Sequence, residues 1–378
     1  MKMVYFACLF FLAALHAFLT IYINSSLVLT TLGESYIAPV FIFTAVMGCI
    51  GFFIAPRLLI SFGNRTFIST LVFLEASALV TVAFEPSSHV IIGALCVHLI
   101  LAPILGFAID VLFEASGLTK GRVGIARSAM LVSTNSALII APFFSGILAN
   151  MGYSYVYGAS AVVLILFGLI APSAMKLCRD GTCNVPSVFN TLKTFVGPQA
   201  TALWAQWVLR IFYAWSVIYI PLYLREIYGL SWEQVGFAMT VSLLPFVLFE
   251  LPVGFLAEKV LGEKELMVLG FITISCATFI LSSNSTLSFV ALLWLLFILR
   301  VGASLVEVAT EAHFFRCVPT RNTDAITAFR MTGQLGFLVG TAVAGVGFIF
   351  FPLEHIFYFF SLVILLGLIP ATLMKDSR

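Results

Sequence analysis

The sequence predicts an all-α membrane protein with twelve transmembrane helices in two six-helix bundles. Three observations lead to this fold class: an extreme composition, long apolar runs and an internal repeat. Of the 378 residues, 61% are hydrophobic and only 10% are charged, and the mean hydropathy is +1.12. A globular domain carries about 25% charged residues. A helix that crosses a bilayer needs about 20 apolar residues, and twelve runs near that length follow one another along the chain.

The first half contains six of these runs, which are continuous rather than alternating and therefore predict helices instead of barrel strands. They cover residues 3–31, 37–59, 66–84, 89–113, 124–150 and 155–175. The first run is too long for the apolar core of a cleaved signal peptide, which has about 7–15 residues. The second half contains the other six runs. They cover residues 201–224, 235–257, 266–281, 287–314, 325–351 and 355–374.

Basic residues fall in alternate connections, from Lys2 at one end to Arg378 at the other. By the positive-inside rule, this alternation places both termini in the cytoplasm. We expect a multi-pass protein of the plasma (inner) membrane, surrounded by lipid and acting as a monomer. The net charge of +2 comes with no basic cluster, so nucleic acid is not an expected partner.

The two halves share sequence patterns at a constant offset. The pattern IYI-x-x-x-L begins at Ile21 and again at Ile218, 197 residues later (218 − 21). The pattern acid-x-x-x-acid begins at Asp110 and again at Glu307, with the same offset (307 − 110). Because six is an even number of spans, a duplicated unit keeps its topology, and the halves are parallel repeats. We predict bundles at residues 1–175 and 199–378, joined by a cytoplasmic linker at 176–198.

Charged turns rich in glycine separate the second run from the third in each half. The later turn, GFLAEKVLGEK, begins at Gly254 and contains Glu258, whereas the earlier copy begins at Gly51 and has Ala55 in place of the acid. These turns and the repeat resemble the major facilitator superfamily, in which Asp usually stands at the position of Glu258. The resemblance covers the whole chain. It implies a transporter whose central cavity is lined by the first, fourth, seventh and tenth helices.

Polar residues on the helices that line the cavity by this resemblance are the candidate substrate-binding residues. They are His16, Tyr22, Asn24, His98, Gln206, Arg210, Tyr213 and Arg300. An arginine in mid-membrane costs at least about 2.5 kcal/mol on insertion scales and must face a partner or a wet cavity. Two such arginines favour an organic anion as substrate, ahead of neutral sugars or hydrophobic drugs.

Structural alternatives stay open for these residues. Glu75, Glu250 or Glu307 could each neutralise an arginine within the bundle. A hydrogen-bonded core histidine is favoured over a proton carrier at both histidine positions, and the two amides are typical of hydrogen bonds between helices.

Acidic pairs four residues apart lie on one helix face, and basic residues begin the following helix. They predict ion pairs that close the inner mouth, although a static brace is the alternative. The gating or coupling candidates are Asp110, Glu114, Arg127, Glu307, Glu311 and Arg330, and the resemblance to the family adds Glu258. Acids and histidines within the spans make a proton the expected coupling ion, with sodium as the alternative.

No Gly-x-x-x-x-Gly-Lys-Ser/Thr loop occurs, so ATP is not the energy source within this chain. We expect a secondary active transporter that moves a small-molecule substrate by alternating access, with no cofactor, metal or catalytic residue. The alternative is a membrane-embedded lipid-modifying transferase, which would need a convergent catalytic set that the short external loops do not offer. A transport-inactive sensor would need an added soluble domain.

Overall fold

The computed structural model describes residues 2–84, 87–116, 123–175, 195–249, 252, 262–284, 286–318 and 323–374. The regular elements in these ranges are all helical. The chain divides into two compact units: unit 1 contains residues 1–185 and 231–237, and unit 2 contains residues 186–230 and 238–378.

Unit 1 is built from the helices of the first half. They are α1 (Lys2–Ile21), α2 (Asn24–Leu32), the 3₁₀ helix η1 (Glu34–Tyr36), α3 (Ile37–Ala83), α4 (Ser88–Ala115), α5 (Val123–Met151) and α6 (Tyr153–Met175). In this unit α3 packs against α4 and α6, and α1 packs against α5 and α6.

Unit 2 is built from the helices of the second half. They are α8 (Pro198–Glu226), α9 (Trp232–Leu248), α11 (Glu263–Ser283), α12 (Phe289–Cys317), α13 (Thr323–Phe350), α14 (Ile356–Leu365) and α15 (Leu368–Leu373), with the first residues of α9 belonging to unit 1. Here α8 packs against both α12 and α13, and α11 packs against α12 and α14.

The helices have the lengths that a bilayer requires. In the described part of the chain, nine are long and apolar enough to cross a membrane, and Trp232–Leu248 and Leu335–Phe350 are shorter apolar helices. One of the nine covers 50 residues from Glu34 to Ala83, or about 75 Å at 1.5 Å per residue, which is more than twice a bilayer core of about 30 Å. It therefore supplies two spans, and the described helices are consistent with twelve (8 + 2 + 2).

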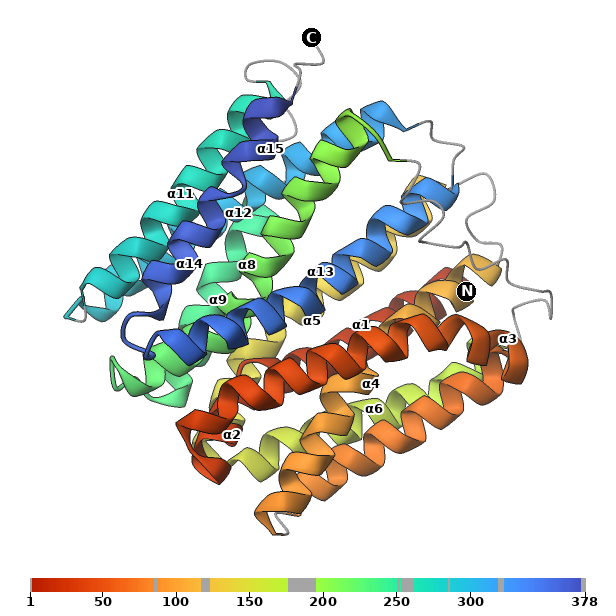
Figure 1. The fold of residues 1–378 in the computed structure, drawn as a ribbon. Coiled ribbons are helices and arrows are strands. Elements are labelled where there is room, and N and C mark those ends of the chain that lie inside the picture. Colours follow the sequence, from red (N-terminus) through yellow and green to blue (C-terminus); the bar gives the residue numbers. More distant parts are fainter. Residues whose placement is uncertain are drawn as a thin grey trace. The chain divides into compact units, whose positions relative to one another are not determined.

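Gly63 divides the two arms of α3. Its φ of 76° and ψ of 158° are not helical, and the ribbon of α3 turns back part-way along its length (Figure 1). Glycine adopts a positive φ readily because it has no Cβ. The predicted turn between the second and third spans thus falls at Gly63, while the GFFIAPR stretch from Gly51 to Arg57 lies within the helix.

The first and last spans are interrupted, which the sequence did not predict. The span predicted at 3–31 is broken at Tyr22 and Ile23, between α1 and α2, and the span predicted at 355–374 is broken at Leu366 and Gly367. The second copy of the IYI pattern lies inside the continuous α8. The two copies therefore share sequence without sharing local structure.

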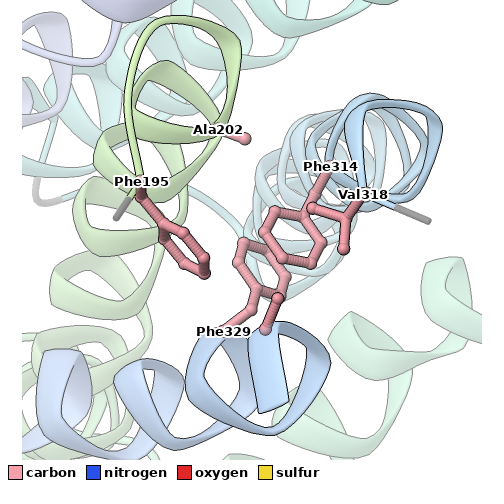
Figure 2. Packing of buried hydrophobic residues seen from close by; sticks show 6 residues of the cluster. Phe195, Ala202, Phe314, Val318 and Phe329 are labelled. Carbon is pink, nitrogen blue, oxygen red and sulfur yellow. The ribbon is translucent and has the colours of Figure 1, made fainter. Parts of the chain in front are cut away.

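An apolar cluster joins the first residues of α8, the end of α12 and the start of α13, as Figure 2 shows. Its buried members are Phe195, Ala202, Phe314, Val318, Ala325 and Phe329. The rings of Phe314 and Phe329 stack with centroids 3.9 Å apart and an interplanar angle of 14°. This contact joins the end of α12 to the start of α13.

Candidate functional site

Five side chains of unit 2 form an arginine cluster: Gln206, Arg210 and Tyr213 on α8, and Arg300 and Glu307 on α12. The α8 members are spaced at i, i+4 and i+7, so they share one helix face. The two α12 members are seven residues, or two turns, apart. Helix periodicity and the packing of α8 on α12 therefore bring together residues that the sequence assigned separately to substrate binding and to gating.

Glu307 holds this cluster together. Arg210 Nη2 donates to Glu307 Oε1 at 3.3 Å, and the Tyr213 hydroxyl donates to Glu307 Oε2 at 2.8 Å. The side chains of Arg210 and Glu307 are 26% and 24% exposed. With its amide oxygen turned toward Arg210, Gln206 accepts from Nη2 and Nε at 3.1 and 3.2 Å. The pair is therefore a hydrogen-bonded ion pair that remains accessible.

Arg300 lies deeper than Arg210, with only 3% exposed. Its Nη2 donates to Ser216 Oγ at 3.1 Å, and its Cζ lies 5.3 Å from the ring centroid of Phe212 and 5.7 Å from that of Tyr213. Arg210 Cζ lies 5.4 Å from the same tyrosine ring. Cation–π contacts of this kind contribute about 0.5–2 kcal/mol, so the ring of Tyr213 links the two arginines.

Glycines on α13 allow that helix to pack closely against α8 at the arginine cluster. A Cβ added at Gly333 would lie 3.3 Å from Arg210 Nε, and one at Gly336 would lie 3.0 Å from Arg210 Cβ. At Gly340 it would lie 2.6 Å from Ile211 Cα. The Gly-x-x-Gly-x-x-x-Gly spacing of these residues lets the two helix backbones approach closely.

Unit 1 contains a second group, the histidine cluster of His16, Thr20, Glu75 and His98. Glu75 is fully buried, and its Oε1 lies 2.9 Å from His16 Nε2 and 3.1 Å from His98 Nδ1. Thr20 Oγ1 lies 2.9 Å from His98 Nε2. Glu75 therefore pairs with histidines, so the alternative in which it neutralises an arginine is wrong. Among the acids suggested for that role, Glu307 does pair with one.

Two further candidates lie beside the break between α1 and α2. Asn24 Oδ1 accepts a hydrogen bond from the hydroxyl of Tyr157 on α6 at 2.7 Å, and both residues are buried. Tyr22 is buried in the break itself. The hydrogen bond fits the interhelix alternative for Asn24.

Two of the remaining gating candidates are among the residues whose side chains the structure describes. Asp110 is half-buried on α4, and Glu311 is exposed on α12. Four others lie outside the described residues or have side chains outside them: Glu114, Arg127, Glu258 and Arg330. Glu250, suggested as a neutralising acid, also lies outside them. The predicted ion pairs at the inner mouth stay a prediction.

The sequence did not single out an ion-pair group at the start of α11. Glu263 is 3% exposed, its Oε2 lies 2.9 Å from His313 Nδ1, and its Oε1 lies 3.0 Å from Arg316 Nε. An acid in the first turn of a helix complements the helix dipole, and His313 and Arg316 are one turn apart on α12. That spacing was the signal available in the sequence.

Within the described residues, no group of three or more His, Cys, Asp or Glu side chains is arranged to hold a metal ion. The two clusters therefore offer hydrogen bonds and charge.

Three comparisons agree with this architecture. Residues 202–378 match the family model of the Major Facilitator Superfamily. The uncharacterized MFS-type transporter YttB of Bacillus subtilis (strain 168) is 26% identical over 298 residues, which cover 74% of this chain and 72% of that protein. Crystal structures of a mutant and of the original nucleoside transporter NupG superpose with TM-scores of 0.75 and 0.70, each at 12% identity and with full coverage of both chains. The second half of the chain is thus similar to the Major Facilitator Superfamily, and the described helices include nine that are long and apolar enough to cross a membrane.

Proposed function

We propose that this protein is a secondary active transporter that moves a small organic anion by alternating access, with a proton as the coupling ion. The observation that carries the proposal is the ion pair of Arg210 and Glu307, which lies within α8 and α12 and is about a quarter exposed. An accessible guanidinium within a membrane span is costly unless it serves a partner. A solute anion could take the place of Glu307 as the partner of Arg210.

The geometry of this pair favours exchange. Charge-assisted N–H···O bonds are usually about 2.7–2.9 Å long, whereas the contact from Arg210 Nη2 to Glu307 Oε1 is 3.3 Å. A guanidinium binds a carboxylate or phosphate best through two parallel hydrogen bonds. A solute anion that supplies this bidentate geometry therefore competes well with Glu307.

Binding at Arg210 would also change how α8 and α12 are held together. Glu307 accepts hydrogen bonds from both Arg210 and Tyr213. When a solute anion replaces Glu307 at Arg210, Glu307 keeps only its hydrogen bond from Tyr213. Reorganisation between α8 and α12 is the local event that we propose to accompany the alternation of access.

The wider arrangement follows the same proposal. We place the two bundles at residues 1–175 and 199–378, with a linker at 176–198, in a plasma membrane with both termini cytoplasmic. The functional unit is a monomer. The buried acids and imidazoles of the spans supply the groups for proton coupling.

Ligand-induced thermal stabilisation of the purified protein tests the anion site. The panel should contain monocarboxylates, dicarboxylates, sugar phosphates, neutral sugars and an uncharged nucleoside, because NupG is a nucleoside transporter. We expect stabilisation by one class of anion, weak stabilisation in Arg210→Lys and none in Arg210→Gln. Arg65→Gln, at an exposed position of α3, is the matched control. Stabilisation by neutral solutes alone, or an undiminished anion response in Arg210→Gln, would contradict the proposal.

A further inference from the structure

The histidine cluster is a hydrogen-bond network with two open positions. Glu75 Oε1 accepts from both imidazoles when the carboxyl is ionised, so His16 carries a hydrogen on Nε2 and His98 carries one on Nδ1. Among the described residues, Glu75 Oε2 and His16 Nδ1 have no hydrogen-bond partner. All three side chains are at most 2% exposed. The one remaining polar atom of these three side chains is His98 Nε2, and its partner decides which protonation states the network can accommodate.

Thr20 provides that partner in two ways. Its Oγ1 lies 2.9 Å from His98 Nε2 and 3.0 Å from the carbonyl oxygen of Ala17. A hydroxyl has one hydrogen to donate and can also accept. When the hydrogen points to Ala17, Oγ1 accepts from His98, which is then a doubly protonated imidazolium. When the hydrogen points to His98, the imidazole is neutral. Rotation of one hydroxyl therefore satisfies both protonation states.

Three atoms could receive an added proton, and they differ in whether a hydrogen-bond acceptor lies beside them. A proton on His16 Nδ1 or Glu75 Oε2 would be a buried donor that lacks an acceptor in the described residues, which costs about 1–3 kcal/mol. A proton on His98 Nε2 gains Thr20 as its acceptor. It also turns the 3.1 Å contact between His98 and Glu75 into an ion pair. A buried carboxylate without a counter-charge costs several kcal/mol, so the proton stabilises the cluster at His98.

The helices around Glu75 present no competing charge at hydrogen-bond distance within the described residues. From α1 and α4, the two imidazoles face it. From α6, Ser160 donates to the carbonyl oxygen of His16 at 2.7 Å, and Tyr157 is bonded to Asn24.

In the described residues, the other elements packed against α3 bring no further charged group to within hydrogen-bond distance of Glu75. The sequence of α2 has no ionisable side chain, and Glu34 and Tyr36 of η1 are exposed. Asp110 lies twelve residues along α4 from His98, or about 18 Å. The thiols of Cys49 on α3 and Cys96 on α4 are half-buried.

We propose that the histidine cluster is a proton-binding site in which the proton enters at Nε2 of His98. That this is the coupling proton rests on the proposed transport function. Thr20 lies in the last turn of α1, and its carbonyl oxygen accepts from Ile23 N at 2.9 Å across the break between α1 and α2. Protonation of His98 on α4 therefore changes the hydrogen bond of the Thr20 hydroxyl, next to the interruption of the first span.

Nitrogen NMR of the protein in lipid nanodiscs, with nitrogen-15-labelled histidine, tests the site directly. The chain has five histidines, and loss of a signal in His98→Gln assigns His98. Between about pH 5 and pH 8, the range over which a histidine side chain changes its charge, we expect His98 to change from two protonated nitrogens to Nδ1–H alone. His16 should keep Nε2–H throughout. The probe is the proton of the buffer, with no solute added.

Variants distinguish protonation at His98 Nε2 from nonspecific structural effects of a substitution. Thr20→Val removes the acceptor and should lower the ratio of imidazolium to imidazole at His98 about tenfold or more at a fixed pH. Thr20→Ser keeps a hydroxyl and should restore it. Glu75→Gln should leave His98 neutral over the whole range, while His89→Gln, at an exposed position, should change nothing at His98.

An unchanging His98 signal in the original protein would overturn the proposal, and so would equal titration in Thr20→Val and Thr20→Ser. A proton found on Glu75 by its carbonyl infrared band would overturn it as well. These outcomes are independent of the proposed substrate. Titration of His98 together with absence of anion uptake would support the proton site and reject the anion function.

Discussion

Glu307 on α12 binds Arg210 on α8 through Oε1 and Nη2 at 3.3 Å, across 97 residues of sequence. The same carboxylate accepts the hydroxyl of Tyr213 at 2.8 Å. One acid thus connects a cation, an aromatic ring and two helices. In the proposed mechanism this acid holds Arg210 until a solute anion replaces it.

Glu307→Gln should keep the hydrogen bonds in part while removing the charge. The expected loss of unfolding free energy is about 1.5–3 kcal/mol, the usual contribution of a hydrogen bond to a charged group. Anions should bind Arg210 more tightly in this variant because their competitor is weaker, whereas net uptake should fall. Thermal unfolding with and without ligand measures the first effect. Weaker anion binding in Glu307→Gln would show that the carboxylate assists the solute.

Arg300 distinguishes charge from shape. Arg300→Lys retains a cation but loses the planar group that contacts Ser216 and the ring of Phe212. We expect weak uptake in Arg300→Lys and none in Arg300→Gln, with both variants folded in the membrane. Uptake should be measured beside size-exclusion profiles. Normal uptake in Arg300→Gln would make the residue structural.

Gly340→Ala should separate α13 from α8. The new Cβ would lie 2.6 Å from Ile211 Cα, a backbone atom that cannot rotate away, and overpacking of this kind costs about 1–3 kcal/mol. Gly93→Ala is the control because its Cβ would meet nothing within 4 Å. Unfolding midpoints in detergent should fall for the first variant only. Equal midpoints would mean that the two helices adjust freely.

Glu263→Gln should weaken the junction of α11 and α12. The buried carboxylate serves both His313 and Arg316, and removal of one partner from a buried pair costs about 3–5 kcal/mol. The value here should be at the lower end or below it, since Arg316 is 37% exposed. Glu265→Gln, two residues away and exposed, should have little effect. A similar loss of stability in both variants would point to helix charge instead of the ion pair.

Much of the fold could be predicted because the bilayer sets the length of each helix. The apolar runs and the common face of Arg210 and Tyr213 both follow from helix periods. The break between α1 and α2 could not be predicted, since neither Tyr22 nor Ile23 is a helix-breaking residue.

The histidine cluster was hidden for a different reason. His16 and Glu75 are 59 residues apart and His98 is 23 residues beyond Glu75, so their meeting depends on the rotation of three helices about their axes. Periodicity gives the face of one helix but not which face of a neighbour it meets. The same limit hid the contact of Ser216 with Arg300 and of Tyr157 with Asn24.

The central claim is tested most directly by uptake of the stabilising anion into proteoliposomes, with and without an imposed pH gradient. We predict that the gradient accelerates uptake in the original protein and in Arg65→Gln, and that Arg210→Gln shows no uptake under either condition. Gradient-driven accumulation of the anion by Arg210→Gln at the original rate would contradict the account.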